Sequence, residues 1–491
     1  MSYQEPEQGL ADAGVYGHFI GGDFAEPRGN TVIESINPPN GRVPARFAEA
    51  TEAQVDAAVS AAYDAFHGDW KRTTVREFHH YMIRLARALG ARAEERAWLE
   101  TLDVGKSTAA SRATMRDLPY SIDYYAGNML SLAGQTLSLA EHDVLNVTLR
   151  EPLGVCGLIV PWNYPVMRAL LKIAPALEAG NTVVLKPPVV TQLSAYELAR
   201  AVEEAGFPPG VVNIVFGSGR VGSYLVNHPK VAKISFTGGS TTGAKIYAAA
   251  AQVKRLILEL GGESPLTAFD DADIEHTGEV AKIDCTRNAD QVCAACTRLI
   301  VQDSVADAFI EALGTALANV RVGAPGDEAT EMGPLVNAAQ LGRVHEYVRI
   351  GADEGARMTP HHDLSNRSDL AEGYFYLPSL FVEAKHEIRA RRRKFLAQSR
   401  PCCVFCRRGG GHMFHQRVEL WPHGQRLYQA HQPGPACREI HRGKNGLREL
   451  WRQGGRRIVF RWIQAIRRRQ RTRYRGDVDD TQVKSVRAFH G

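Results

Sequence analysis

The sequence contains no apolar run that approaches the roughly 20 residues of a membrane-spanning helix. Its first residues, Met1 to Gly14, are acidic and lack the apolar core of a signal peptide. The 8 cysteines stand at irregular spacings in 491 residues, which is not the pattern of a disulfide framework. These absences predict a protein of the reducing cytoplasm that does not associate with membranes.

Acidic residues are scarce in one segment only. Residues 385–476 contain 4 Glu and no Asp against 22 Arg and 3 Lys, a net charge of +21 in a chain whose total is +5. The rest of the chain is therefore acidic, with a net charge of −16. A basic block of this kind ordinarily suggests a nucleic-acid partner, but the origin of the segment, given below, excludes that interpretation.

The remaining composition, 44% hydrophobic and 23% charged residues, is typical of a soluble enzyme with two or three structural units. Residues 18–50 suggest a short hairpin region, with the sequence His-Phe-Ile-Gly-Gly-Asp at 18–23, and loops. Residues 52 to about 140 are expected to be mainly helical, because alanines recur at helical spacing between Ala57 and Phe66.

Residues 151–260 alternate between short apolar runs and amphipathic stretches. We expect strands at 155–160, 182–185, 211–216, 231–236 and 256–260, with helices at 166–179, 194–205, after Gly219, and at 243–251. This alternation predicts an α/β fold with a parallel sheet covered on both faces, which binds ligands at the carboxyl ends of its strands. A second α/β segment follows from about 266 to 384.

Polar or glycine-rich residues follow these strands. The first strand ends at Pro161–Pro165, the second at Lys186–Pro188, the fourth at Phe236–Gly243 and the fifth at Glu259–Gly262. A glycine-rich turn that opens a helix can bind phosphate through backbone N–H groups, although a plain tight turn is the alternative. Glu259 beside two glycines leaves room for a ligand, or is only a solvated carboxylate.

A cysteine pair follows in the stretch from Asn288 to Arg298. Cys293 and Cys296 form a CxxC pattern that could be redox-active or half of a metal site, and a lone intracellular cysteine is often just a small buried side chain. No second pair with zinc-type spacing lies nearby, so we expect no metal.

In combination these motifs are specific. Trp-Asn-Tyr-Pro, Lys-Pro, Phe-Thr-Gly-Gly-Ser, Glu-Leu-Gly-Gly and Gln-x-Cys, in this order over about 130 residues, resemble the aldehyde dehydrogenase family. Glu100–Lys106, Tyr124–Gly127, Gly333–Val336 and Gly373–Pro378 fit the same family. The resemblance covers roughly residues 18–384 and resumes in the last dozen residues.

The resemblance implies a role for several residues. Cys293 matches the nucleophile that forms a thiohemiacetal and then a thioester, Asn163 the amide that stabilises the oxyanion, and Glu259 the base that activates water for hydrolysis. Lys186 resembles the residue that bonds the adenosine ribose of NAD or NADP. The remaining cofactor-binding positions that the resemblance implies are Trp162, Phe236, Thr237, Gly238, Gly239, Ser240, Gly243 and Gly261.

The resemblance also implies an organisation. Residues 18–129 and 151–260 would form a Rossmann-like cofactor domain, 261–478 an α/β catalytic domain, and 130–150 with 479–491 a small β oligomerisation arm. The implied activity is NAD(P)-dependent oxidation of a small-molecule aldehyde by a homodimer or homotetramer.

Three positions depart from the family pattern. Val189 stands where many members have a glutamate that bonds the ribose 2′-hydroxyl and repels a 2′-phosphate, so NADP could also be accepted. Asp290 replaces the usual glycine before Gln291, and its charge could raise the pKa of Cys293. Glu263 replaces a common lysine, without a functional interpretation.

The pattern stops after Ala384, where the family continues with Glu-Glu-Ile-Phe-Gly-Pro-Val. Residues 392–399, written as AGG AGG AAA TTT TTG GCC CAG TCG and read from the third base, encode that peptide. Residues 460–471, read from the second base, can likewise encode the family's late glycine-rich motif. We infer that residues 385–478 are translated out of frame, so their arginines reflect misread GC-rich codons, and Cys402, Cys403 and Cys406 do not form a metal site.

Two alternatives remain open. A CoA-acylating semialdehyde dehydrogenase would release the thioester to CoA and generally lacks the base, so Glu259 argues against it. An inactive pseudoenzyme or misread gene product is supported by the altered segment.

Overall fold

The computed structural model describes residues 10, 12, 14–129, 133–137, 144–250, 254–262, 265–359 and 367–382, together with the backbone of 402–408 and 481–489. Residues 1–407 and 477–491 form one compact unit. Most of the segment 385–478, including the predicted glycine-rich motif, lies outside the described residues. Among the described helices, none combines the length and apolarity needed to cross a membrane.

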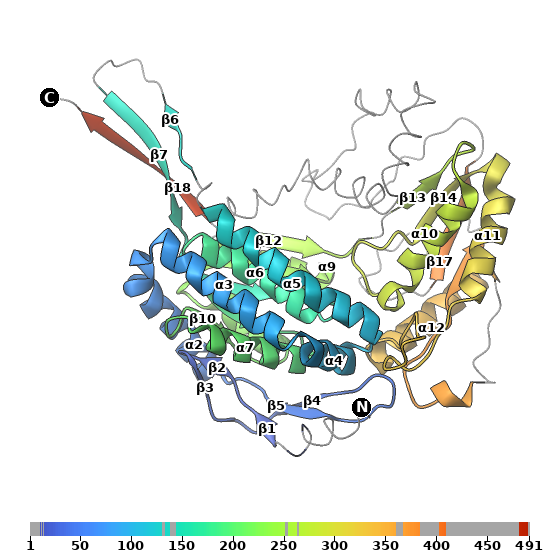
Figure 1. Ribbon diagram of the computed structural model, residues 1–491, viewed down its shortest axis with the longest axis horizontal. Helices are drawn as coiled ribbons and strands as arrows, with labels where there is room; N and C mark the ends of the chain where they lie inside the picture. Colours follow the sequence, from blue (N-terminus) through green and yellow to red (C-terminus); the bar gives the residue numbers. More distant parts are fainter. Residues whose placement is uncertain are drawn as a thin grey trace. The chain divides into compact units, whose positions relative to one another are not determined.

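A seven-stranded sheet forms the centre of the part of the chain that runs from β2 to β12 (Figure 1). The strands β12 (Arg255–Leu260), β11 (Val231–Gly238), β8 (Val155–Ile159), β9 (Thr182–Lys186) and β10 (Val212–Ile214) lie in that order and are all parallel. The hairpin of β2 (Phe19–Ile20) and β3 (Asp23–Phe24) extends the sheet antiparallel beside β10. The predicted parallel sheet and the hairpin are confirmed.

Alternate residues of the inner strands enter two different cores, which explains why the sequence of these strands is continuously apolar. Cys156 and Leu158 of β8 pack in one cluster, and Val155 and Ile159 in the other. All five residues of β8 are buried. The sheet is therefore covered on both faces.

The helices that follow the strands are α6 (Pro165–Glu178), α7 (Leu193–Ala205), α8 (Gly219–Asn227) and α9 (Ser240–Ala250). The first core also contains side chains of α3 (Val75–Ala91), α4 (Ala93–Val104) and α5 (Thr108–Asn128), and the second contains those of α2 (Glu52–His67). Thr51 and Thr74 begin α2 and α3 with reciprocal capping boxes, which satisfy N–H groups that have no partner within the helix.

Two sequence-based boundaries were wrong. The helical region does not continue to about residue 140, because α5 ends at Asn128 and Thr136–Leu137 form strand β6. The predicted loop Phe236–Gly243 is mostly regular structure, because β11 runs to Gly238 and α9 begins at Ser240. The glycines suggested a loop, but Gly243 lies within α9, where the absence of a Cβ lets the helix pack close to Leu260 of β12.

A second sheet carries the cysteine loop. Its strands are β13 (Pro265–Ala268), β14 (Arg298–Gln302), β17 (Cys402–Arg408), β16 (Ser379–Val382) and β15 (Arg357–Thr359), in that order. The helices α10 (Ile274–Thr286), α11 (Ala306–Ala318) and α12 (Ala338–Asp353) accompany this sheet. Only the backbone of β17, which falls within 385–478, is described, and it does not test the reading frame.

Two three-stranded sheets complete the described structure. β1 (Val15–Tyr16), β5 (Ala45–Ala48) and β4 (Val32–Ser35) form the first. In the second, β18 (Thr481–Phe489) lies antiparallel along β7 (Val144–Pro152), with β6 on the other side of β7 (Figure 1). The domain boundaries proposed from the sequence remain predictions.

Candidate active site

The order of the strands creates a point where the winding of the sheet reverses. From β8 the chain proceeds through β9 to β10 on one side, and then returns to place β11 on the other side of β8. In open α/β sheets, ligands bind beside such a point, at the carboxyl ends of the strands. The segments after Ile159 of β8 and at Gly238 of β11 lie at the carboxyl ends of these adjacent strands, and both were predicted to carry site residues.

The loop before Cys293 has an unusual backbone. Asn288, Ala289 and Asp290 have φ angles of 53°, 51° and 60°, in the left-handed region that residues with a Cβ rarely occupy. Such a conformation persists only where surrounding contacts fix it. Asp290, which stands where the family usually has glycine, therefore adopts a conformation that is freely accessible only to glycine.

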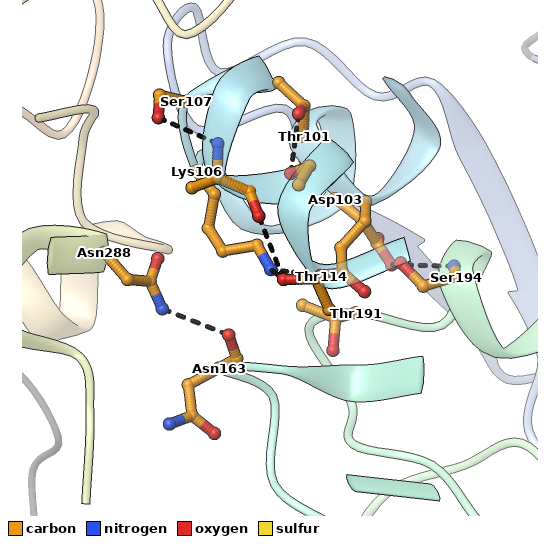
Figure 2. Close-up of polar contacts among 12 residues, drawn as sticks. Thr101, Asp103, Lys106, Ser107, Thr114, Asn163, Thr191, Ser194 and Asn288 are labelled. Atoms are coloured by element: carbon orange, nitrogen blue, oxygen red, sulfur yellow. Dashed lines mark hydrogen bonds and ion pairs between the residues drawn. The ribbon is translucent and has the colours of Figure 1, made fainter. Parts of the chain in front are cut away.

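Hydrogen bonds from side chains fix this loop. Gln291 Nε2 donates to the Asn288 carbonyl at 2.8 Å, and the backbone N–H of Val336 donates to Gln291 Oε1 at 2.9 Å. Asn288 Nδ2 donates to the backbone oxygen of Asn163 at 3.1 Å, as Figure 2 shows. These contacts connect the cysteine loop to the segment that follows β8.

Asn163 lies directly against the cysteine loop. Its side chain is buried, and Nδ2 donates to the Gln291 carbonyl at 2.7 Å, two residues before Cys293. A primary amide carries two N–H groups, so this bond leaves the second one for another acceptor. Asn163 stands between β8 and α6, and Pro165 at the first turn of α6 fixes where that helix begins.

The two cysteines of the CxxC pattern differ in environment. Cys293 is partly exposed, whereas Cys296 is buried. Burial raises the pKa of the Cys296 thiol to about 12, and the charge of Asp284 and a hydrogen bond to it act in the same direction. Cys296 therefore remains a protonated thiol at neutral pH, and only Cys293 of the pair is suited to be a nucleophile.

One contact to Cys293 was not anticipated from the sequence. Arg168, on the first turn of α6, donates from Nη2 to Cys293 Sγ at 3.3 Å. Arg168 comes five residues after Asn163, and the proximity of a guanidinium to a thiol 125 positions away in sequence arises only in the folded chain.

Glu259 ends β12 beside the carboxyl end of β11. Thr237 is its register partner on β11, and Thr237 Oγ1 donates to Glu259 Oε2 at 3.2 Å. Glu259 is partly exposed and Thr237 is buried. The predicted base is thus oriented by a predicted cofactor-site residue.

The glycines of the fourth strand end allow close packing. A Cβ on Gly238 would lie 2.6 Å from Cζ of Phe236, and one on Gly243 would lie 2.5 Å from Leu260 Cδ2. Gly239 alone separates the strand from α9, so the first N–H groups of this helix of 11 residues lie immediately after the strand. Ser240 and Gly239 remain partly exposed, and Gly261 is also partly exposed after β12.

Lys186 ends β9 with only 5% of its surface exposed. Burial lowers the pKa of its ammonium group to about 8, although the charge of Glu49 partly offsets this effect. Glu49, which the sequence did not single out, accepts the Ser218 backbone N–H at 3.1 Å and pairs with Arg220 at 2.7 Å. After Lys186, the carbonyl of Val189 accepts the Gln192 amide at 3.0 Å.

A buried ion pair lies behind the Trp162–Pro165 segment. The side chains of Lys106 and Glu100 pair with both fully buried, and Lys106 Nζ also lies 3.3 Å from Thr114 Oγ1, as drawn in Figure 2. The same ammonium lies 4.4 Å from the ring centroid of Tyr164, the residue after Asn163. The family-like motif Glu100–Lys106 was the signal in the sequence, but its contact with Tyr164 was not predictable.

Comparison with known proteins agrees with this arrangement. The model of the aldehyde dehydrogenase family matches residues 24–395. A Burkholderia cenocepacia protein assigned to the aldehyde dehydrogenases is 38% identical with a TM-score of 0.76, and the match covers 80% of each chain. A mutant of the Bacillus cereus aldehyde dehydrogenase is 35% identical, with a TM-score of 0.77 and coverage of 84% of this chain and 82% of that one.

Betaine aldehyde dehydrogenase from Staphylococcus aureus, solved in complex with NAD+, is 32% identical over 83% of this chain and 80% of that one, with a TM-score of 0.77. The chain described above belongs to the aldehyde dehydrogenase family. The family resemblance and the fold class predicted from the sequence are confirmed.

Proposed function

We propose that this chain oxidises an aldehyde to the carboxylic acid with NAD or NADP, using Cys293 as nucleophile and Glu259 as base. The observation that carries the proposal is the bond from Asn163 Nδ2 to the Gln291 carbonyl, which places an oxyanion donor against the loop of a partly exposed cysteine.

In the first step the Cys293 thiolate attacks the aldehyde carbon, and a carbon–sulfur bond forms as the carbonyl π electrons move to oxygen. The second N–H of the Asn163 amide and the backbone N–H of Cys293 are the donors we assign to this oxyanion. Because the Gln291 bond already fixes the Asn163 amide, these donors need little reorganisation when charge develops.

The residues fit a dinucleotide. The desolvated ammonium of Lys186 has a pKa lowered to about 8, so acceptor oxygens of a ribose would compensate its burial. The first N–H groups of α9, close to Gly239 and Ser240, suit a pyrophosphate. A bound nicotinamide would supply the acceptor for the hydride that the thiohemiacetal must lose.

Hydrolysis of the resulting thioester is the step we assign to Glu259. Its carboxylate takes a proton from water, the water oxygen bonds to the thioester carbonyl, and the sulfur leaves as the thiolate of Cys293. Thr237 Oγ1 donates to Glu259 Oε2 at 3.2 Å, which orients the carboxylate.

The experiment is to measure aldehyde-dependent reduction of NAD and NADP, and to identify the product with and without CoA. A free carboxylic acid that forms at the same rate without CoA supports the proposal. An acyl-CoA product, formed only when CoA is present, would favour the CoA-acylating alternative.

We further propose that residues 385–478 are translated out of frame. The family match ends at residue 395, close to the point where the motif is lost. Sequencing the DNA over codons 380–480 tests this directly. An insertion or deletion must lie near each end of the segment, and at least one more must lie between residues 399 and 460, because the two motifs are read from different bases of the codon. An uninterrupted frame would show that the basic segment belongs to the protein.

For the intact cytoplasmic enzyme we propose a homodimer or homotetramer assembled through the sheet of β6, β7 and β18. Leu145 and Leu149 lie on the same face of β7 and are 45% and 46% exposed. Apolar residues exposed on one sheet face suit contact with a second copy. Light scattering of Leu149→Asp and of wild type compares their masses, and an unchanged oligomer would exclude this face.

A further inference from the structure

The guanidinium beside the nucleophile has capacity for a ligand. Arg168 is partly exposed, and its side chain donates a hydrogen bond from Nη2 to Cys293 Sγ at 3.3 Å. Its Nε–H is buried without a hydrogen-bond partner, and no carboxylate pairs with Arg168 among the residues that the structure describes. Arginine carries five N–H donors in a planar fork, so most of its donors remain available.

We propose that Arg168 determines substrate specificity by pairing with a carboxylate on the aldehyde. The edge formed by Nε and Nη2 is the one that binds a carboxylate through two parallel hydrogen bonds. A neutral aldehyde would leave Nε–H unsatisfied, whereas a carboxylate satisfies it and neutralises the charge. The inference rests on the proposed role of Cys293, because Cys293 marks where the aldehyde carbon is bound.

The position of Arg168 sets the length of the substrate. Nη2 lies 3.3 Å from Sγ, and charge-assisted N–H···O bonds extend about 2.8 Å further. With carbon–carbon bonds of about 1.5 Å, the carboxylate carbon would lie roughly two to four bonds from the aldehyde carbon. The substrate class is therefore a short aldehyde acid.

The chemistry of the sulfur separates two roles for Arg168. In the free enzyme Arg168 Nη2 donates to Cys293 Sγ. A role of Arg168 toward this sulfur would affect every aldehyde equally, because each of them bonds to the same atom. A pairing with a substrate carboxylate affects only the aldehydes that carry one, so it discriminates between substrates and a role toward the sulfur does not.

Alkylation of Cys293 tests the proposal without dehydrogenase activity. Iodoacetate and iodoacetamide displace iodide through the same thiolate and differ mainly in the negative charge of the carboxylate. Rates at Cys293, followed by mass spectrometry of its peptide in the full-length chain, give an iodoacetate-to-iodoacetamide ratio. We expect this ratio to fall about tenfold in Arg168→Met, in line with the loss of one charge-assisted pair.

Two control variants make the result specific. Arg349→Met removes the same charge from an exposed residue of α12 and should leave the ratio unchanged, which excludes an effect of net charge. Arg168→Lys keeps the charge without the fork and should give an intermediate ratio. Either of two results would overturn the proposal. The first is an iodoacetate-to-iodoacetamide ratio that is the same in the native wild type and in the urea-unfolded chain. The second is an Arg168→Met variant in which both reagents react more slowly by the same factor.

A second comparison uses 4-oxobutanoate and butanal, which share four carbons, as substrates of an active preparation. Wild type should prefer the charged aldehyde, and Arg168→Met should reduce that preference about tenfold, mainly through KM. Oxidation of both aldehydes with an unchanged preference in the variant would overturn the carboxylate assignment. If neither aldehyde is oxidised by wild type, the proposed function fails, while the alkylation ratio still reports on Arg168.

Discussion

The side-chain amide of Asn163 donates a 2.7 Å hydrogen bond to the backbone carbonyl of Gln291, 128 residues further along the chain. This bond joins the segment after β8, a strand of the seven-stranded sheet, to the loop that carries Cys293. Asn288 strengthens the same junction by donating to the Asn163 backbone at 3.1 Å. The proposed oxyanion donor and nucleophile are thereby held as one unit.

Replacement of the nucleophile should abolish turnover and preserve cofactor binding. In Cys293→Ala, with the reading frame restored, we expect at least a thousandfold loss of kcat, because no covalent intermediate can form. Cys296→Ala is the matched control and should remain active, since burial keeps the pKa of that thiol at about 12. Residual turnover above a few per cent in Cys293→Ala would move the nucleophile elsewhere.

Loss of the base should separate the two halves of the reaction. Glu259→Gln is expected to give a burst of reduced cofactor followed by slow steady-state turnover, because acylation of Cys293 does not need the hydrolytic base. Stopped-flow absorbance of the reduced nicotinamide measures both phases. A steady-state rate equal to that of wild type would remove Glu259 from the mechanism, and Thr237→Val should show a smaller defect of the same kind.

Lys186 should weaken the fold while it serves the cofactor. Burial lowers the pKa of its ammonium group from 10.5 to about 8. Below pH 8 the group is charged in both the folded and the unfolded chain, so the free-energy cost of burying the charge is fully present. This cost disappears as the pH rises from about 8 to above 10.5. Lys186→Met should therefore raise the free energy of unfolding at pH 7 by on the order of 2–3 kcal/mol, measured by urea denaturation. This difference between variant and wild type should shrink as the pH approaches 10.5.

The same Lys186→Met variant should bind cofactor at least tenfold more weakly by calorimetry, because the donor to the ribose is lost. Equal stability of variant and wild type at pH 7 would contradict the burial argument. Unchanged cofactor affinity would contradict the ribose assignment.

Cofactor choice should depend on Val189. Wild type is expected to use NADP measurably beside NAD, since valine presents no carboxylate to a 2′-phosphate. Val189→Glu should lower kcat/KM for NADP by about tenfold or more through charge repulsion, while NAD is retained. Val189→Gln, which is similar in size and uncharged, controls for shape. If wild type strongly prefers NAD and Val189→Glu leaves this preference unchanged, other residues discriminate between NAD and NADP.

The chain as written should not form a stable active oligomer. The segment 385–478 replaces about ninety residues of the expected catalytic domain, and natural domains are stable by only about 5–15 kcal/mol. Expression of the written and the frame-restored sequences permits comparison of solubility, mass and aldehyde-dependent cofactor reduction. Comparable activity of the written chain would refute the frame argument.

Several features were determined by the sequence alone. The apolar runs within 155–160 and 182–185 predicted strands of a parallel sheet, because strands covered on both faces carry few polar positions. The structure has strands at Val155–Ile159 and Thr182–Lys186, and both are buried throughout. The order of motifs from Trp162 to Cys293 identified the family. These are local patterns and spacings, which the chain carries before it folds.

Other features were decided only by tertiary structure. No spacing reveals that β11 returns to lie beside β8, that Arg168 meets Cys293, or that Cys296 is the buried thiol of the pair. Strand order, charge proximity and desolvation depend on contacts between residues distant in sequence. Burial and the charge of Asp284 raise the pKa of the Cys296 thiol, whereas Cys293 is partly exposed, so two cysteines three positions apart lie in different environments.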